Sequence, residues 1–294
     1  MSIELPLRKK IYVGPVTDSN AWDGFELRDD DIIVSTPPKC GTTWMQSITM
    51  MLVFGKPGMD IGIDKISLWL DCAFRDREEI ARRLNVQSHR RCIKTHTPLD
   101  GITYSPDVTY ISVYRHPMDV HFSMRTHVEN QKADVDRYRA QFPDDISDGF
   151  RMFVENELDG TGTDTLTVAS VVEHYLSVKN WAHLRNIHMF HYADLTRDLA
   201  GQMDRLAGIY GIEHSAELMA TLVDAATFKS MKTNAANTPG REDSVFKNDA
   251  EFFSSATSNK WEKILTKAHV AAYDARIGGL LSQADRNWLE WGST

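Results

Sequence analysis

The sequence predicts an α/β fold, with a single domain whose central parallel sheet is flanked by helices. Short apolar runs that suit buried strands alternate along the chain with segments of helical periodicity. Strands and helices that alternate in this way form a parallel sheet, because each helix carries the chain back across it. No linker rich in Pro, Gly or Ser divides residues 1–294, so we expect one domain.

The first strand is predicted at residues 32–34, an apolar run. The two prolines at 37–38 cannot donate to a strand ladder, so the chain then forms a loop. Thr42 or Thr43 is the expected N-cap of the helix that follows, and Gly55 is its expected end. The apolar positions that share one face of this helix are Trp44, Ile48, Met51 and Leu52.

Three further strands are predicted at residues 91–94, 109–114 and 187–192. Pro117 suits the first turn of a helix after the third strand. A helix from Asp194 through about Tyr210 follows the last strand. Strand, loop and helix therefore recur along the chain.

Two polar segments interrupt this pattern, at residues 125–165 and 233–260. Both contain Gly, Pro, Asn and Asp positions that break regular structure. Long loops in compact domains are usually lids or binding segments. We therefore expect both segments to border a ligand site.

The bulk composition excludes several classes of function. A net charge of −8 argues against a nucleic-acid partner held by general attraction. No apolar run approaches the roughly 18 residues that a membrane helix needs, and the first residues have no signal-peptide core. The three cysteines, Cys40, Cys72 and Cys92, fit neither a disulfide framework nor a zinc site. We expect a cytoplasmic protein.

Three residues that suit anion chemistry follow directly after predicted strands. Lys39, His96 and Arg115 each lie just beyond a strand end, where parallel sheets bind ligands. The loop around Lys39 opens a helix, whose free N–H groups favour an anion. However, Lys39 precedes Gly41, whereas the lysine of a nucleotide P-loop follows its second glycine. The loop is P-loop-like but serves a different anion.

Three motifs in this order resemble those of the cytosolic-type sulfotransferases. TPPKCGTTW at 36–44 is similar to the family's 5′-phosphosulfate loop, T-Y-P-K-S-G-T-T-W. The segment 110–123 resembles its 3′-phosphate segment, and KTHTP at 94–98 resembles its K-x-H-x-P motif. Minor agreements lie at 192–195 and 227–232. The resemblance, to a bacterial-looking member, covers nearly the whole chain and implies 3′-phosphoadenosine 5′-phosphosulfate (PAPS) as the donor.

The resemblance implies three catalytic residues. His96 would act as the general base for the acceptor, since imidazole titrates near neutral pH. Lys39 would neutralise the bridging oxygen as the nucleotide leaves, and Lys94 would stabilise the non-bridging oxygens of the sulfuryl group. Sulfuryl transfer resembles phosphoryl transfer, whose catalysis is mostly positioning and charge stabilisation.

The resemblance also implies the residues that bind the donor. Arg115 and Ser123 would hold the 3′-phosphate, since Ser123 lies about two helical turns after Arg115. The phosphosulfate loop adds Lys39, Cys40, Gly41, Thr42 and Thr43. The residues at the adenine would be Trp44, Tyr192, Thr227 and Phe228. The three aromatic residues could instead belong to the hydrophobic core.

The sequence departs from the family at the third nucleotide segment, R-K-G-x-x-G-D-W-K. The matching residues 254–262 read SSATSNKWE, so two cationic contacts to the 3′-phosphate are absent. Either a nearby cation compensates, for which we favour Arg241 over Lys247 and Lys260, or the protein binds the donor weakly, or it prefers a donor without that phosphate. Cys40 stands where the family has serine; it is either a reactive thiol beside Lys39 or an inert small residue.

Two other functions stay open on the sequence alone. One is a kinase-like P-loop enzyme, and the other is a nucleotide-binding protein without turnover. The acceptor is expected to be a small molecule with a phenol, alcohol or amine group, and the oligomeric state is open. Five aromatic residues either line its pocket or belong to the core: Trp69, Phe74, Phe142, Phe150 and Phe153. No metal is expected, because His188 and His191 would face opposite sides of a strand.

Overall fold

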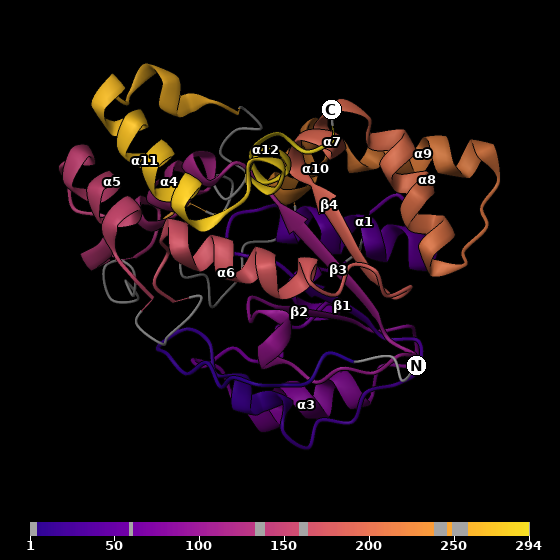
Figure 1. Cartoon of the computed structure of the whole chain (residues 1–294). Helices are drawn as coiled ribbons and strands as arrows, with labels where there is room; N and C mark the ends of the chain where they lie inside the picture. The colour runs from indigo at the N-terminus through magenta and orange to yellow at the C-terminus, as the bar shows by residue number, and fades with distance from the viewer. Residues whose placement is uncertain are drawn as a thin grey trace.

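The computed structural model describes residues 5–58, 61–132, 139–158, 164–237, 246–248 and 258–293. Within them lies one four-stranded sheet in the order β2-β1-β3-β4, and every pairing in it is parallel (Figure 1). The strands are β1 (Ile32–Ser35), β2 (Cys92–Thr95), β3 (Thr109–Tyr114) and β4 (Ile187–His191). Helices cover both faces of the sheet, which confirms the predicted single α/β domain.

The register of the sheet brings the ends of its strands to one edge. Ser35 of β1 is paired with Thr95 of β2, and Ile32 is paired with both Cys92 and Thr109. Because parallel strands share their direction, the segments that follow β1, β2 and β3 leave the sheet from the same side. Lys39, His96 and Arg115 belong to those segments.

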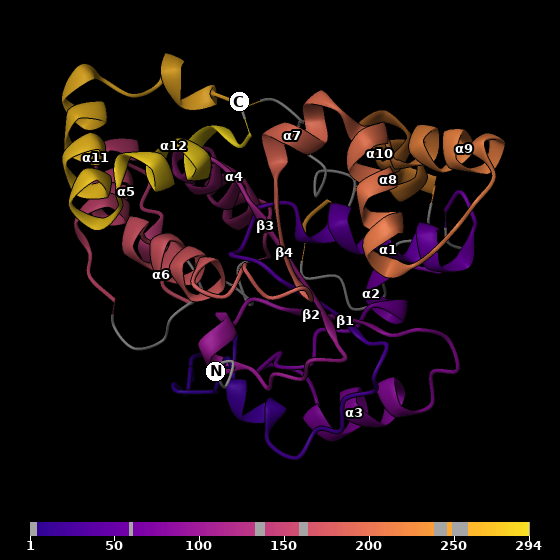
Figure 2. The ribbon, with the colours of Figure 1, turned by 45° about the vertical axis from the view of Figure 1, so that its right-hand side comes forward.

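The two faces of the sheet carry different helices. Figure 2 shows α1 (Thr42–Phe54) and α6 (Val168–Lys179) on opposite sides of the strands. Successive residues of a strand point to opposite faces. Ile32 and Val34 accordingly pack in the cluster with α1, whereas Ile33 packs in the cluster with α6.

The remaining helices extend these two layers. The α1 side continues with α8 (Leu199–Tyr210) and α9 (Ala216–Ala226), and the α6 side with α4 (Pro117–Glu129), α5 (Ile146–Glu155), α11 (Lys267–Leu280) and α12 (Gln283–Trp291). Shorter or peripheral helices are α2 (Ile63–Ile66), α3 (Arg77–Asn85), α7 (Tyr192–Arg197), α10 (Phe228–Asn237), η1 (Ser19–Trp22), η2 (Leu99–Gly101), η4 (Arg139–Gln141) and η6 (Lys260–Lys263).

Several helix boundaries differ from those predicted. The N-cap of α1 is Gly41, not a threonine, since the hydroxyl of Thr42 bonds to that of Thr36 instead. The helix expected from Asp194 is divided into α7 and α8, because Asp198 caps a new helix by accepting from the N–H of Gly201. Local side-chain caps thus override the longer periodic pattern.

The polar segments are more regular than expected. Residues 125–165 contain the end of α4 and the whole of α5, whose N-cap is Asp145. The other segment, 233–260, begins inside α10. Phe142, Phe150 and Phe153 are buried around His121, which places them in the core.

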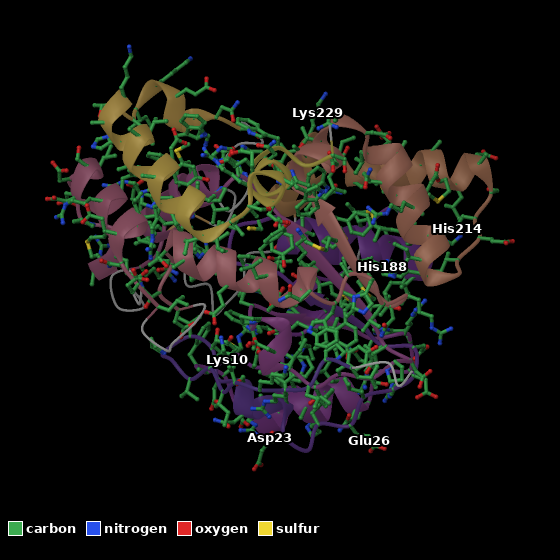
Figure 3. The ribbon with its side chains drawn as sticks, viewed as in Figure 1. Lys10, Asp23, Glu26, His188, His214 and Lys229 are labelled. Atoms are coloured by element: carbon green, nitrogen blue, oxygen red, sulfur yellow. The ribbon has the colours of Figure 1, made fainter. Side chains whose placement is uncertain are left out.

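A buried ion pair joins the starts of β1 and β2. Arg91 and Asp31 are 1% and 0% exposed, and Nε of Arg91 donates to Oδ1 of Asp31 at 2.7 Å. The backbone N–H of Arg28 also donates to Asp31, at 2.8 Å. By contrast, Asp23 is exposed and lies at the lower edge of the molecule in Figure 3. The buried pair therefore fixes the relative position of the two strands that lead to Lys39 and His96.

We predict that Asp31→Asn lowers the free energy of unfolding by about 3 kcal/mol or more, because Arg91 would keep its charge in the core without a counter-ion. Arg151→Gln is the matched control. Arg151 pairs with Asp148 and Glu155 on the exposed surface of α5, where solvent screens the charges, so its loss should change stability far less. Denaturant unfolding of both variants measures the difference; equal effects would contradict the prediction.

Candidate active site

The loop after β1 has an unusual backbone that glycine permits. Lys39 and Gly41 both have positive φ, at 65° and 111°. A Cβ on Gly41 would lie 3.2 Å from the ring of Tyr192, so the loop passes close to that ring. No side chain caps the start of α1. The first N–H groups of the helix are therefore available to an anion.

Lys39 lies where several cationic side chains meet. Its Nζ is 3.2 Å from Nδ1 of His127, which belongs to α4. Burial, together with the nearby charges of Arg115 and Lys94, lowers the pKa of Lys39 to about 7. Like charges gathered in a buried place repel one another, and an anion between them would relieve that repulsion. The cluster fits a sulfate or phosphate group.

His96 has the tautomer that a general base requires. Its Nδ1 lies 2.8 Å from the carbonyl oxygen of Thr36, and a carbonyl can only accept. We therefore assign the proton to Nδ1, which leaves the lone pair of Nε2 free. Burial lowers the pKa of His96 well below its usual value, and the charge of Lys94 lowers it further. His96 is thus a neutral imidazole at neutral pH.

A buried carboxylate, Asp71, holds the surroundings of His96. Its two oxygens accept four side-chain hydrogen bonds at 2.5–2.9 Å, from Trp22, Trp69, Thr95 and Thr97. Two of these donors flank His96 in the sequence, and a third packs on its ring. Sequence reasoning missed Asp71, because a single Asp between apolar residues carries no motif.

Trp69 forms one wall beside His96. The two rings meet edge to face with centroids 4.9 Å apart, and the ammonium of Lys94 lies 4.0 Å from the centre of the indole. Phe74, which is 39% exposed, packs against the same indole at 5.9 Å. Of the aromatic residues predicted to line a pocket, Trp69 and Phe74 are therefore the two that lie at the reactive groups.

Arg115 forms a second cationic position with residues from near the C-terminus. Its guanidinium lies 4.4 Å from the centre of the Tyr192 ring, and its Nε is 4.0 Å from Asp119. Asp119 accepts the N–H of Asn259 at 2.8 Å, which fixes η6 against the start of α4. Burial lowers the pKa of Lys260, and the charge of Arg115 lowers it further, so the two cations are within electrostatic reach.

The structure distinguishes between the cations considered as replacements for the absent Arg-Lys pair. Lys260 lies in η6, within electrostatic reach of Arg115. Lys247 lies at the opposite end of α4, where its Nζ donates to the carbonyl of Glu129 at 2.7 Å. Arg241, which the sequence favoured, lies outside the described residues, as do Ser254 and Ser255.

The residues predicted at the adenine come together from three helices. The indole N–H of Trp44 donates to the carbonyl of Ala226 at 2.8 Å, and its ring meets that of Tyr192 at 5.4 Å. Ala226 directly precedes Thr227 and Phe228, where α10 begins. Both of these residues are half-buried.

The other predicted donor contacts have mixed outcomes. Ser123 and Thr43 are half-buried, on α4 and in the first turn of α1. The side chain of Thr42 is used within the loop, by Thr36. Cys40 is fully buried, and burial raises the pKa of its thiol to about 12. A buried thiol of high pKa is inert, so the reactive alternative for Cys40 is wrong.

His127 is the residue at Lys39 that sequence reasoning did not identify. A signal for it exists in the sequence: His127 follows Ser123 by four residues and Asp119 by eight. Residues four apart lie on the same face of a helix. The three residues therefore form a stripe along α4 from the Arg115 end to Lys39.

Two surface hollows formed by the described residues lie away from these side chains. The described residues form a hollow of about 490 Å³ beside α12, lined by Trp288 and Trp291, and another of about 340 Å³ beside α11. Neither includes Lys39, His96 or Arg115. The chemistry of the side chains identifies the site instead.

The following observations on metal ligands and membrane helices apply to the described residues only. They contain no group of three His, Cys, Asp or Glu side chains that could hold a metal ion. His191 is buried and bonded to the carbonyl of Leu289, whereas His188 is only half-buried on β4 (Figure 3). Of the helices in the described part of the chain, none is both long enough and apolar enough to cross a membrane.

Comparisons with known proteins agree with the geometry. The family model for the sulfotransferase domain matches residues 29–285. A glycolipid sulfotransferase of Mycobacterium bovis is 33% identical over 99% of this chain and 96% of its own, and one from Mycobacterium tuberculosis is equally similar. The fold resembles that of mouse sulfotransferase SULT7A1 complexed with 3′-phosphoadenosine 5′-phosphate (PAP), with a TM-score of 0.71 at 19% identity and 91% coverage of each chain. It also resembles retinol dehydratase in a complex with retinol and PAP, with a TM-score of 0.72 at 20% identity, covering 90% of this chain and 84% of the other.

The family model matches most of this chain, and the glycolipid sulfotransferases align with nearly all of it. Both findings agree with the three motifs and favour a sulfotransferase over the kinase-like enzyme and the nucleotide-binding protein without turnover. The chain belongs to the sulfotransferase family and is a PAPS-dependent transferase.

Proposed function

We propose that His96 is the general base of sulfuryl transfer from PAPS to a hydroxyl of a small-molecule acceptor. The observation that carries this proposal is the hydrogen bond from Nδ1 of His96 to the Thr36 carbonyl. It leaves Nε2 unprotonated beside two lysines, Lys39 and Lys94. A base and a cationic cluster at one place are the components that transfer of an anionic group requires.

His96 would take the proton of the acceptor hydroxyl at Nε2. Its Nδ1–H bond to Thr36 keeps the ring oriented while it does so, and the contact with Trp69 excludes water from one side. A positioned base of this kind contributes about 10²- to 10⁴-fold in rate. The imidazolium formed would stand close to Lys94, so it would release its proton readily.

Lys39 and Lys94 would stabilise negative charge. PAPS, when bound, would supply the sulfuryl group. During transfer, negative charge would develop on the bridging oxygen, near Lys39, and on the non-bridging oxygens, near Lys94. Because Lys39 lies in the loop and Lys94 on β2, they approach from different elements. Each preorganised cation of this kind typically lowers a barrier by about 3 kcal/mol.

Arg115 and Lys260 would bind the 3′-phosphate of the donor. Both are positively charged, and Asp119, a carboxylate that influences both, already accepts the N–H of Asn259. Lys260 would therefore replace the cations that residues 254–255 lack. Ser123 would add a hydroxyl, and the adenine would lie near Trp44, Tyr192, Thr227 and Phe228.

The acceptor is proposed to be an alcohol with an apolar part, and a glycolipid hydroxyl is the first candidate. Two facts support it: the relatives that are 33% identical are named glycolipid sulfotransferases, and Trp69 with Phe74 presents an apolar wall beside His96. Segments 125–165 and 233–260 would border the acceptor. We also propose a cytoplasmic location, since all three cysteines are free thiols.

We predict that His96→Asn lowers kcat by about 10²- to 10⁴-fold while the affinity for 3′-phosphoadenosine 5′-phosphate (PAP) stays within about threefold of wild type. Asn keeps a donor toward the Thr36 carbonyl but cannot act as a base. Transfer from labelled PAPS to a panel of glycolipids, sterols and phenols, with calorimetry of PAP binding, measures both quantities. A variant that keeps its turnover would remove His96 from the mechanism, and tighter binding of ATP with magnesium than of PAP would argue against the donor.

The two shifted pKa values predict where the two limbs of the pH profile lie. Because burial lowers the pKa of His96, the imidazole stays neutral as pH falls, so the acid limb of kcat/KM should lie below pH 6.5. Lys39, with its pKa lowered to about 7, loses its charge as pH rises, so the alkaline limb should lie near pH 7. Lys39→Arg, which stays charged, should abolish the alkaline limb. An unchanged alkaline limb in that variant would show that another group titrates.

Lys260→Ala is predicted to weaken PAP binding by about tenfold and to leave the binding of 5′-AMP unchanged, because 5′-AMP has no 3′-phosphate. Lys263→Ala is the matched control: Lys263 lies in the same short helix but is exposed. Calorimetric titration of the three proteins with both nucleotides gives the comparison. Equal losses in the two variants would indicate general attraction rather than a specific contact.

A further inference from the structure

We propose that His127 is a positioning residue for Lys39, and that Phe246 holds His127 in place. This proposal rests on the proposed role of Lys39 and adds two residues to it. The contacts run in one line: Phe246 packs on His127, and His127 contacts the ammonium of Lys39.

The contact between His127 and Lys39 has a defined direction. Nδ1 of His127 lies 3.2 Å from Nζ of Lys39. Burial lowers the pKa of His127 well below its usual value, and the charges of Lys39, Lys94 and His96 lower it further, so the ring is neutral. A neutral imidazole that meets an ammonium accepts its proton in the hydrogen bond. His127 therefore supports the charged form of Lys39.

Two charged groups near Lys39 act in the opposite sense. Lys94 on β2 and Arg115 after β3 are both cations, and both disfavour the Lys39 charge. His127 contacts the ammonium as an acceptor, whereas these two cations repel it. Because the stem of a lysine is flexible, such an acceptor favours one position of the ammonium.

The segment 246–248 holds His127 from the other side. The rings of Phe246 and His127 meet edge to face with centroids 5.0 Å apart, and Phe246 is 9% exposed. Phe246 also forms an antiparallel bridge with Gln131.

Further hydrogen bonds connect this segment to the end of α4. The N–H of Lys247 donates to the carbonyl of Asn130 at 2.7 Å, and Asn130 exchanges two more bonds with Asn248, at 2.8 and 3.1 Å. Nζ of Lys247 donates to the carbonyl of Glu129, where a cation is favoured by the helix dipole. The ring of Phe246 is therefore rigidly placed against His127.

The first test compares two substitutions of His127. His127→Phe removes the acceptor, whereas His127→Asn keeps an amide oxygen close to the position of Nδ1. We expect His127→Phe to lower kcat by about 10- to 100-fold, as for the loss of one hydrogen bond to a charged group, with little change in PAP affinity. His127→Asn should recover activity to within about threefold of wild type. Equal damage in both variants, or none in either, would overturn the proposal.

His89→Phe is the matched control. His89 also meets a phenylalanine ring edge to face, Phe54, with centroids 5.0 Å apart, but it lies between α3 and β2 and away from Lys39. This variant should keep the kcat and the pH profile of the wild type. It separates a loss of one histidine–phenylalanine contact from a loss at Lys39. Phe246→Ala, which leaves α4 intact, should lower kcat in the same direction as His127→Phe, and wild-type kcat in that variant would exclude the role of Phe246.

A second measurement uses the protein without donor or acceptor. Because His127 supports the charged form of Lys39, His127→Phe should make the amine of Lys39 lose its proton at lower pH. Labelling with acetic anhydride across a pH series, read by mass spectrometry of the Lys39 peptide, reports the free amine. We expect the labelling midpoint to move to lower pH in His127→Phe and to stay near wild type in His127→Asn. An unmoved midpoint in His127→Phe would refute the positioning role even if activity fell.

The two levels of the proposal can fail separately. If Lys39→Ala keeps full turnover, the proposed function of Lys39 is wrong. If Lys39→Ala is inactive while His127→Phe matches the wild type in kcat and in labelling, only the role of His127 is wrong.

Discussion

The parallel pairing of β1 with β2 is the constraint on which the site depends. The buried Arg91–Asp31 pair fixes the start of both strands, and Ser35 is then opposite Thr95 at their ends. This register puts the carbonyl of Thr36 within 2.8 Å of Nδ1 of His96. One backbone group therefore decides which nitrogen of the imidazole carries the proton. A shift of one residue would turn the side chains that follow to the opposite face of the sheet.

The second feature is a group of cations that are held close together at a cost. Lys94 lies on β2, Lys39 follows β1 and Arg115 follows β3, and these three strands are neighbours in the sheet. Each of the three side chains is at least partly buried. Such an arrangement is unfavourable without a ligand, because the charges repel one another and lose hydration. It becomes favourable when an anion is present. Because the protein carries a net charge of −8, we propose that it recognises its anionic donor through these local charges rather than through general attraction.

Helix α4 connects the two ends of the donor site. Its first turn carries Asp119, next to Arg115 and η6, and its last turn carries His127, next to Lys39. A helix of 13 residues spans roughly 20 Å, a distance on the scale of a nucleotide. Since one helix holds both ends, the proposed 3′-phosphate position at Arg115 and the ammonium of Lys39 keep a constant separation. This accounts for the spacing of Asp119, Ser123 and His127 along one face.

The sequence by itself determined the fold class, the four strands and the family, because apolar periodicity and the order of three motifs are local properties of the chain. It also indicated that Lys39, His96 and Arg115 lie at one edge of the sheet, because the ends of parallel strands converge there. Only the tertiary structure decided that Cys40 is buried and inert, that Gly41 caps α1, and that Lys260 lies at Arg115. Asp71 and His127 likewise came from the structure alone. These outcomes depend on burial and on contacts between residues far apart in the chain, and neither quantity is contained in a local pattern.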